Sequence, residues 1–287
     1  MGGANIRRCV GSAFLLLVAA CSGDSAADND DARLGEARQG GVTVALGEPV
    51  RDVPISEARV PGRPIILIDP GHGGVDPGAS GLSGSATEKE LTLAFSRELR
   101  DVLVKNGRVR VAMTRDSDRS LSLAQRADLA GRIGARLFVS IHMDSAPNPL
   151  ARGATVYSLS DVASDAEAAR FASAENAAAD GVTSEEDASV RFLLSDLALR
   201  DRMADSAALA GRLIDSSRGR VLLRPEPHKF AAFYVLKRSE APGVLFEAGY
   251  ISNVDDEAAL LTKEGRTPIV AALARAIEIE SVLSSSR

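Results

Sequence analysis

Cysteine and tryptophan are almost missing from this chain of 287 residues, which contains two cysteines and no tryptophan. Aromatic residues make up 4% of the sequence, and the formal net charge is −5. Nucleic-acid binding relies on basic surfaces and on aromatic side chains that stack on bases, so we expect no nucleic-acid partner. The hydrophobic content of 45% is sufficient for one sizeable core, and we therefore expect a single folded domain.

Residues 1–20 have the composition of a targeting segment rather than of a folded domain. The apolar run that follows Arg7 and Arg8 is too short to span a bilayer. The run ends in V-A-A-C, which resembles the lipobox of bacterial lipoproteins, where the signal is removed and the cysteine is lipidated. We predict a lipoprotein signal peptide here and lipidation of Cys21. An ordinary secretory signal is the alternative.

The region that follows the predicted signal contains little regular pattern. Cys9 lies inside the signal, so the mature chain would keep one cysteine and could form no internal disulfide. Residues 21–63 are rich in Ala, Asp, Gly and Arg, which predicts a flexible tether, with a short strand at 42–46 as an additional feature. The globular domain is expected at residues 64–287. We expect a periplasmic protein anchored to a membrane, and Ser22 favours the outer membrane.

Strand-like and helix-like stretches alternate from Ile65 onwards, which is typical of an α/β sheet. Strands are predicted at residues 65–68, 109–114, 137–141, 153–159, 230–236 and 244–246. Helices are predicted after Thr87, at 121–133, through Asn176, over 183–203, from there to Ser217, and at 268–283. We expect one domain with a mixed, mostly parallel sheet of about six strands and helices on both faces.

Ionisable side chains follow or end three of these predicted strands. His72 follows the first strand, His142 follows the third, and Glu247 stands at the end of the last. The carboxyl ends of parallel strands meet along one edge of a sheet, where ligands bind, so we expect these side chains to lie together. Glu88 is the fourth candidate, because a carboxylate in the first turn of a helix is favoured as an anion.

Two histidines and one glutamate with an open fourth position form a known type of catalytic zinc site. Zinc lowers the pKa of bound water to about 7, and a carboxylate that is not a ligand can then accept the water proton and pass it to a leaving amine. Taken singly, each of the four residues also fits a structural role. Together they predict a metal-dependent hydrolase, in which Glu88 at the start of its helix is suited to be the carboxylate ligand, although residue types alone do not fix which amide is cut.

Five motifs resemble the zinc-dependent N-acetylmuramoyl-L-alanine amidases, in particular the division amidases of Gram-negative bacteria. In chain order they are D-P-G-H-G-G-V-D-P-G-A at 69–79, E-K at 88–89, L-F-V-S-I-H at 137–142, R-G-A-T-V-Y-S-L-S at 152–160 and F-E-A-G-Y-I-S-N at 246–253. The resemblance implies that His72, Glu88 and His142 bind Zn²⁺ and that Glu247 is the catalytic acid/base. It also implies hydrolysis of the amide between N-acetylmuramic acid and L-alanine of peptidoglycan, for cell-wall remodelling and daughter-cell separation.

The same resemblance implies a regulatory insert at about residues 183–203, whose helix blocks the zinc until a protein activator displaces it. Glu185, Glu186 or Asp187 would supply the blocking carboxylate, and an ordinary surface helix is the alternative. The N-terminal region is too short and too polar for the peptidoglycan-binding domain of those relatives. We therefore expect lipidated Cys21 to replace that domain in a monomeric protein.

Two other functions are compatible with these residues. A catalytically inactive envelope lipoprotein would keep the fold and bind peptidoglycan or an activator, and a different zinc hydrolase would cut another amide. Inactive relatives of enzymes usually lose a ligand or the general base, whereas all four residues are present here.

Three further polar residues are predicted to be structural. Arg115 and Arg126 lie in T-R-D and S-L-A-Q-R stretches that also occur in the family, and we expect them to form salt bridges rather than to contact substrate. His228, beside the penultimate strand, is expected to be a surface histidine.

Overall fold

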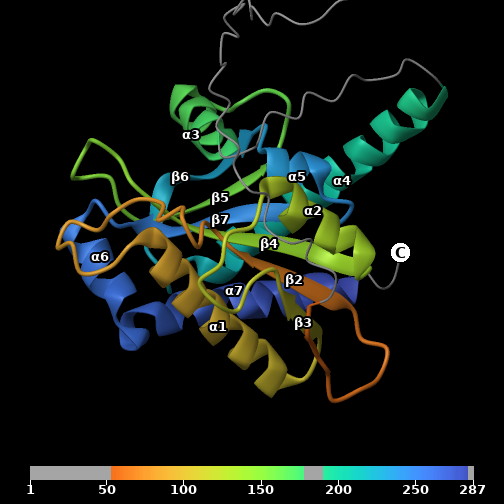
Figure 1. Ribbon diagram of the computed structural model, residues 1–287, viewed down its shortest axis with the longest axis horizontal. Helices are drawn as coiled ribbons and strands as arrows, with labels where there is room; N and C mark the ends of the chain where they lie inside the picture. Colours follow the sequence, from red (N-terminus) through yellow and green to blue (C-terminus); the bar gives the residue numbers. More distant parts are fainter. Residues whose placement is uncertain (1–52, 178–189, 284–287) are drawn as a thin grey trace, which may run out of the picture. The chain divides into compact units, whose positions relative to one another are not determined.

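The computed structural model describes residues 53–177 and 190–283. The predicted signal peptide, the strand at 42–46 and the three acidic candidates Glu185, Glu186 and Asp187 lie outside the described residues. Within the described ranges, one seven-stranded sheet has the strand order β1-β3-β2-β4-β7-β5-β6 (Figure 1). The strands are β1 (Ile55–Ser56), β2 (Ile65–Pro70), β3 (Arg110–Met113), β4 (Ala135–Asp144), β5 (Ala154–Leu159), β6 (Leu223–Ala231) and β7 (Gly243–Tyr250).

The sheet is mixed and mostly parallel, as the sequence predicts. Strands β3, β2, β4 and β7 are parallel neighbours, whereas β5 is antiparallel to β7 and β6 is parallel to β5. The additional strand, β1, pairs antiparallel with β3 and falls within residues 21–63, the predicted tether. Val53 beside it is buried in the core, so the folded domain includes residues before Pro64.

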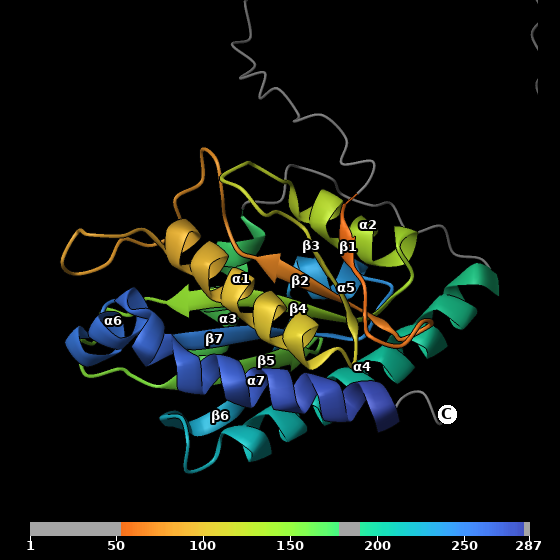
Figure 2. The same ribbon diagram turned by 90° about the horizontal axis from the view of Figure 1, so that it is seen from below.

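Helices cover both faces of the sheet (Figures 1 and 2). Their bounds are α1 (Glu88–Asn106), α2 (Leu123–Arg132), α3 (Ala166–Asn176), α4 (Val190–Ser217), α5 (Tyr234–Arg238), α6 (Val254–Leu261) and α7 (Lys263–Leu283). Helices α1, α4 and α7 share one buried apolar cluster with the sheet, and α2, α3 and α5 share the other. The domain therefore has three layers, the arrangement in which a largely parallel sheet is buried on both faces.

Helix α1 begins and ends at residues that the sequence marks. Thr87 and Glu90 form a capping box, in which the Thr87 side chain accepts from the backbone N–H of Glu90 and the Glu90 carboxylate accepts from the backbone N–H of Thr87. Gly107 ends the helix in the left-handed conformation at φ 69°, which glycine adopts without a steric penalty. Leu91, Phe95 and Leu99 lie on one helical stripe and are buried against the sheet. This fixes the first turn of α1, which carries Glu88, at the edge of the sheet.

Three predictions for the second half of the chain differ from the structure. Residues 230–236 were expected to be a strand, but the chain leaves β6 at Ala231 and forms α5, because a short apolar run has no periodicity that separates a strand from a buried helix. The two helices expected between 183 and 217 are one continuous helix, α4, over its described length. Helix α6 was not predicted, although Asn253 caps it by accepting from the backbone of Asp255 and Asp256.

Crossing a bilayer requires a helix that is both long and strongly apolar. Within residues 53–177 and 190–283, none of the helices meets that requirement.

Candidate metal centre

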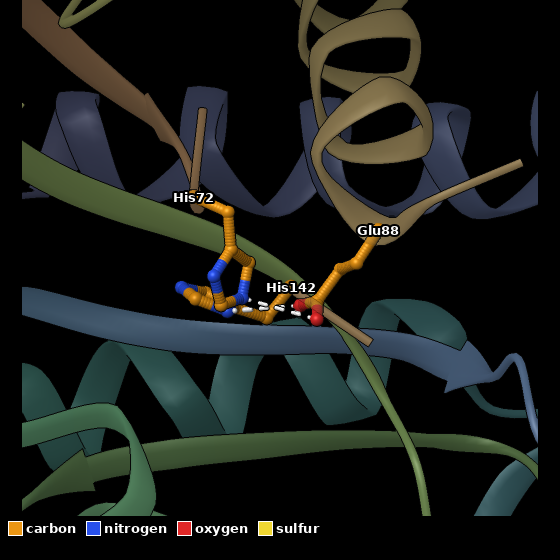
Figure 3. Close-up of side chains that lie close together, drawn as sticks. All are labelled: His72, Glu88 and His142. Carbon is orange, nitrogen blue, oxygen red and sulfur yellow. Dashed lines mark hydrogen bonds and ion pairs between the residues drawn. The ribbon is translucent and has the colours of Figure 1, made fainter. Parts of the chain in front are cut away.

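The predicted residues converge at the carboxyl edge of the central strands (Figure 3). His72 lies two residues beyond β2, His142 lies near the end of β4, and Glu88 is the first residue of α1. Glu247 is the register partner of His142 on the neighbouring strand β7. Parallel pairing of β2, β4 and β7 therefore brings together side chains that are far apart in the sequence, as the strand-end argument predicts.

The two histidines face one carboxylate. Nε2 of His72 lies 3.0 Å from Oε2 of Glu88, and Nδ1 of His142 lies 3.1 Å from Oε1 of the same residue. The two imidazole rings meet edge to face with centroids 5.0 Å apart. One ligand atom from each of the three residues lies within 4.8 Å of the others, so the group could hold a metal ion.

The donor set fits zinc. Two imidazole nitrogens and a carboxylate oxygen are ligands that zinc accepts at about 2.0–2.2 Å, which leaves ligand atoms roughly 3.4 Å apart around a tetrahedral ion. Nε2 of His72 is buried and, despite its distance of 3.0 Å from Glu88, makes no aligned hydrogen bond within the described residues. A buried ring nitrogen that lacks an aligned hydrogen bond is well placed to bind a metal ion.

The loop that carries His72 packs closely against the other two ligand candidates. Nδ1 of His72 lies 2.8 Å from Oδ2 of Asp76, and a proton shared there fixes the tautomer that presents Nε2 to the centre. A Cβ atom on Gly71 would lie 2.5 Å from the ring of His142, and one on Gly78 would lie 2.7 Å from Oε2 of Glu88. Side chains at these two positions would displace the ligands, which explains the glycines of the motif.

Charge is concentrated at the three ligand candidates. Burial alone would lower the pKa of His72, but the hydrogen bond to Asp76 and the carboxylate of Glu88 that faces the ring outweigh it and raise the pKa to about 10. Burial would raise the pKa of Glu88, whereas the two histidines that face its carboxylate hold that pKa well below the usual range. Glu88 also accepts from the backbone N–H groups of Ala79 at 3.0 Å and Met143 at 3.0 Å. Without a metal, a proton on His72 balances the charge of this carboxylate.

Glu247 differs from Glu88 in having no such partners. Its side chain is fully buried, and neither carboxylate oxygen has a hydrogen-bond partner among the described residues. Burial, followed by the nearby charges of Asp144, Glu88 and Glu175, raises the pKa of Glu247 well above its usual value. A carboxyl group with a raised pKa beside a candidate metal site has the properties of a general acid/base.

The family model described as N-acetylmuramoyl-L-alanine amidase matches residues 66–279. The chain belongs to this amidase family. All four candidate residues lie inside the matched range, and the family predicted from the motifs is confirmed.

Individual relatives agree with the family assignment. The chain is 34% identical to the N-acetylmuramoyl-L-alanine amidase AmiA of Escherichia coli over 220 residues, which cover 75% of each chain. It is 32% identical to AmiC of Neisseria meningitidis over 242 residues, 81% of this chain and 58% of that one.

Solved structures of the amidase family share the fold. The amidase AmiC2 of Nostoc punctiforme matches with a TM-score of 0.57 at 27% identity, over 79% of this chain and 99% of that one. Ami1 of Mycobacterium smegmatis matches with a TM-score of 0.54 at 21% identity, over 77% and 97% of the two chains, and shows the fold alone.

The amidase site contains a further carboxylate that the sequence analysis missed. Oε2 of Glu175, in the last turn of α3, lies 3.6 Å from Nδ1 of His142. Burial raises the pKa of Glu175, and the positive charge of His142 acts in the opposite direction. The sequence places Glu175 in an Ala-rich helix, but only the path of the chain after β5 brings that helix end to the site.

Helix α3 is held in place by contacts at both ends. Glu167 near its start accepts from Arg224 at 3.1 Å and from Lys229 at 2.6 Å. The ring of Phe171 packs against Tyr157 and Phe233 in the core. At its end, Asn176 donates to the backbone carbonyl of Ala232 at 2.8 Å and accepts from the backbone N–H of Tyr234 at 2.7 Å. These contacts hold the neighbouring Glu175 at the site.

Asp144 is a second buried acid close to the centre that was not predicted. It ends β4, two residues after His142, and burial raises its pKa to about 6, although a hydrogen bond with Tyr250 acts to lower it. His228, expected at the surface, is instead half-buried in β6 and bonds through Nε2 to the hydroxyl of Ser158 at 2.8 Å.

Proposed function

We propose that this protein is a zinc-dependent N-acetylmuramoyl-L-alanine amidase of the bacterial envelope. It would hydrolyse the amide between the lactyl group of N-acetylmuramic acid and the L-alanine of the stem peptide. The observation that carries the proposal is the convergence of His72, Glu88 and His142 within 4.8 Å, beside a buried Glu247 whose carboxylate has no hydrogen-bond partner in the described part of the chain. Family membership supports the choice of this amide, which residue types alone do not fix.

His72, Glu88 and His142 would hold Zn²⁺, which supplies Lewis-acid chemistry when bound. Asp76 keeps the ring of His72 in one tautomer and orientation. Glu247 accepts a proton from the attacking water at a carboxylate oxygen and returns it to the amide nitrogen as the stem peptide leaves. A cation in the site favours the ionised form of Glu247, which the metal-free surroundings disfavour.

We also propose that α3 keeps the enzyme inactive. The carboxylate of Glu175 lies 3.6 Å from Nδ1 of His142, the same nitrogen that faces the ligand candidate Glu88. A protein activator would have to detach the end of α3 to admit the substrate. The predicted blocking residues Glu185, Glu186 and Asp187 stay predictions, whereas the distance of Glu175 from His142 makes it our candidate.

Digestion of purified peptidoglycan tests the activity, with the zinc-loaded Glu175→Gln variant, which lacks the proposed block by α3, as the parent into which the other substitutions are introduced. We expect release of stem peptides with a free N-terminal L-alanine, and a loss of at least about a hundredfold in Glu247→Gln. Asn106→Ala, at the far end of α1, is the matched control. Equal release by parent and Glu247→Gln would contradict the assigned role, and release of other fragments would indicate another amide. No release under any condition, with binding to peptidoglycan retained, would favour the inactive lipoprotein.

We propose that residues 1–20 are a lipoprotein signal, residues 21–63 include a tether, and Cys21 carries the lipid that anchors the domain to the outer membrane from the periplasm. The variant Cys21→Ser is expected to leave the membrane fraction while its released catalytic domain keeps parental activity. Fractionation followed by the peptidoglycan assay measures both properties. A variant that stays with the membrane would show that another segment anchors the protein.

A further inference from the structure

Two buried arginines donate hydrogen bonds to backbone carbonyls of the loop that carries His72. The exposed fractions of Arg115 and Arg126 are 1% and 3%. The sequence predicts salt bridges for both, and Arg126 forms one with Asp69 at 2.8 Å. Arg115 instead bonds to backbone carbonyls and a hydroxyl of the described residues. Buried guanidinium groups that face carbonyls are uncommon, because an uncompensated buried charge is destabilising.

Arg126 holds the backbone of His72 itself. Its guanidinium donates to the carbonyl of Pro70 at 2.7 Å and to that of His72 at 2.5 Å. Asp69 fixes the guanidinium from the other side, and its carboxylate also accepts from the hydroxyls of Thr114 at 2.6 Å and Ser140 at 3.0 Å. The donor that contacts the His72 carbonyl is therefore held in one position.

His72 needs such support because its backbone is in an unfavourable conformation. Its φ of 57° lies in the left-handed region, and it is the one residue other than glycine with a positive φ in the described ranges. Residues with a Cβ avoid this region unless the surrounding structure enforces it. The left-handed turn brings the carbonyl of His72 to Arg126 and, on the opposite side, the imidazole to Glu88.

Arg115 connects the segments that carry two different ligands. It donates to the carbonyl of Gly71, the residue before His72, at 2.6 Å, and to the carbonyl of Lys89, the residue after Glu88, at 2.9 Å. It also donates to the hydroxyl of Thr92, in the second turn of α1, at 3.1 Å. One rigid, planar group thus spans the end of β2 and the first turn of α1. Lysine could not replace it, because a single ammonium group cannot reach several separated carbonyls in a fixed plane.

We propose that Arg115 and Arg126 are positioning residues for the metal, in addition to supporting the fold. Arg126 holds His72 in its left-handed conformation, and Arg115 sets the separation between the segments of His72 and Glu88. This inference rests on the proposed metal site. It predicts that both arginines determine zinc affinity although neither contacts the ion.

Lysine variants test the proposal through metal binding rather than activity. We would measure the zinc affinity of the full chain by competition with a chelator, the thermal unfolding of the metal-free protein, and the visible spectrum of its Co²⁺ form. Arg115→Lys and Arg126→Lys are expected to weaken zinc binding by about 10–100-fold and to alter the Co²⁺ bands. The control is Arg266→Lys, which removes another buried arginine, one that bonds Glu98 and the carbonyl of Leu260 rather than the segments of the ligands. It is expected to lose stability but to keep parental zinc affinity.

Thr92→Val is a milder variant for the case in which the lysine variants do not fold. It removes a hydroxyl that contacts Arg115 and donates to Gly71 at 3.0 Å, without changing the size of the side chain. We expect a loss of zinc affinity of about threefold. Parental zinc affinity in the folded variants, at a loss of stability that matches Arg266→Lys, would overturn the positioning role. A parent that binds no zinc would instead contradict the proposed function.

Discussion

The carboxyl groups of the site differ in what surrounds them rather than in how deeply they are buried. Glu88 accepts from two backbone N–H groups and faces two histidines, whereas Glu247 has no hydrogen-bond partner among the described residues. Partners that donate stabilise the anion, and burial without partners stabilises the neutral acid. The first environment suits a permanent ligand, and the second suits a group that gains and loses a proton.

Replacing Glu247 by glutamine should separate activity from stability. The neutral amide removes a buried acid without partners, so we expect the metal-free variant to unfold at the same temperature as the parent or at a higher one. Thermal unfolding of the metal-free proteins measures this. A clear loss of stability would show that the ionised carboxylate supports the fold.

Zinc affinity should depend on pH through His72. Its pKa is raised from 6.5 to about 10, so the stability given by the protonated ring is fully present below 6.5 and is lost as the pH rises to 10. Zinc competes with that proton, and its apparent affinity should therefore rise with pH in this window, by up to about tenfold per pH unit. Chelator competition between pH 6 and 9 measures the slope.

Asp76→Asn supplies the comparison for the pH dependence. It removes a carboxylate that raises the pKa of His72, so zinc affinity should level off at a lower pH than in the parent. Flat profiles for both proteins would show that no proton is displaced from His72.

The sequence predicts some of these residues better than others. His72, His142 and Glu247 follow from the strand-end argument, because the strands that precede them are strongly apolar. Glu88 is predicted from its place in the first turn of a helix and from the resemblance, but its backbone partners Ala79 and Met143 are not predictable, because only the fold joins them to it. The carbonyl contacts of Arg115 were missed for the same reason.

At the scale of elements, α3 combines a packed middle with a short polar attachment at its end. Phe171 fixes the middle of the helix in the aromatic core. At the end of the helix, the side chain of Asn176 bonds to the backbone of Ala232 and of Tyr234, the first residue of α5. If α3 is the inhibitory element, we expect its end to detach while its middle stays in place. This is the property that a reversible inhibitory element requires.

Asn176→Ala should therefore raise basal activity. The variant loses two hydrogen bonds worth together about 2 kcal/mol, which would increase the detached population roughly 30-fold if the end is normally closed. Peptidoglycan digestion without an activator measures it, with Asn106→Ala as the control for loss of a side-chain amide contact elsewhere in the fold. Glu175→Gln should also be active without an activator. Parental basal rates in both variants would contradict inhibition by α3.

Some helices and strands of this fold have a clear residue pattern, and others do not. The capping box of α1 and the strands β2, β4 and β7 carry strong, unambiguous signals, and they define the site. Apolar runs with weak periodicity do not, which is why part of residues 230–236 forms α5 rather than a strand. The extra edge strand β1 is too short for any pattern, and its pairing with β3 depends on the fold.

At the scale of the whole molecule, the metal should contribute measurable stability. Zinc at a thousandfold excess over its dissociation constant stabilises the folded state by about 4 kcal/mol, which corresponds to roughly 10 °C for a domain of this size. Thermal unfolding with and without a chelator measures the shift. Restoring zinc should reverse it and adding Mg²⁺ should not. No shift in a protein that binds zinc would mean that the unfolded chain binds it equally well.

The order of strands in the sheet has a consequence for how the centre comes into existence. Glu88 and His142 are 54 residues apart, and His142 and Glu247 become neighbours only when β4 and β7 have paired. Contacts between such distant segments form late in folding. A newly made chain therefore has no assembled site, and the three ligand candidates can hold a metal together only once the sheet has formed.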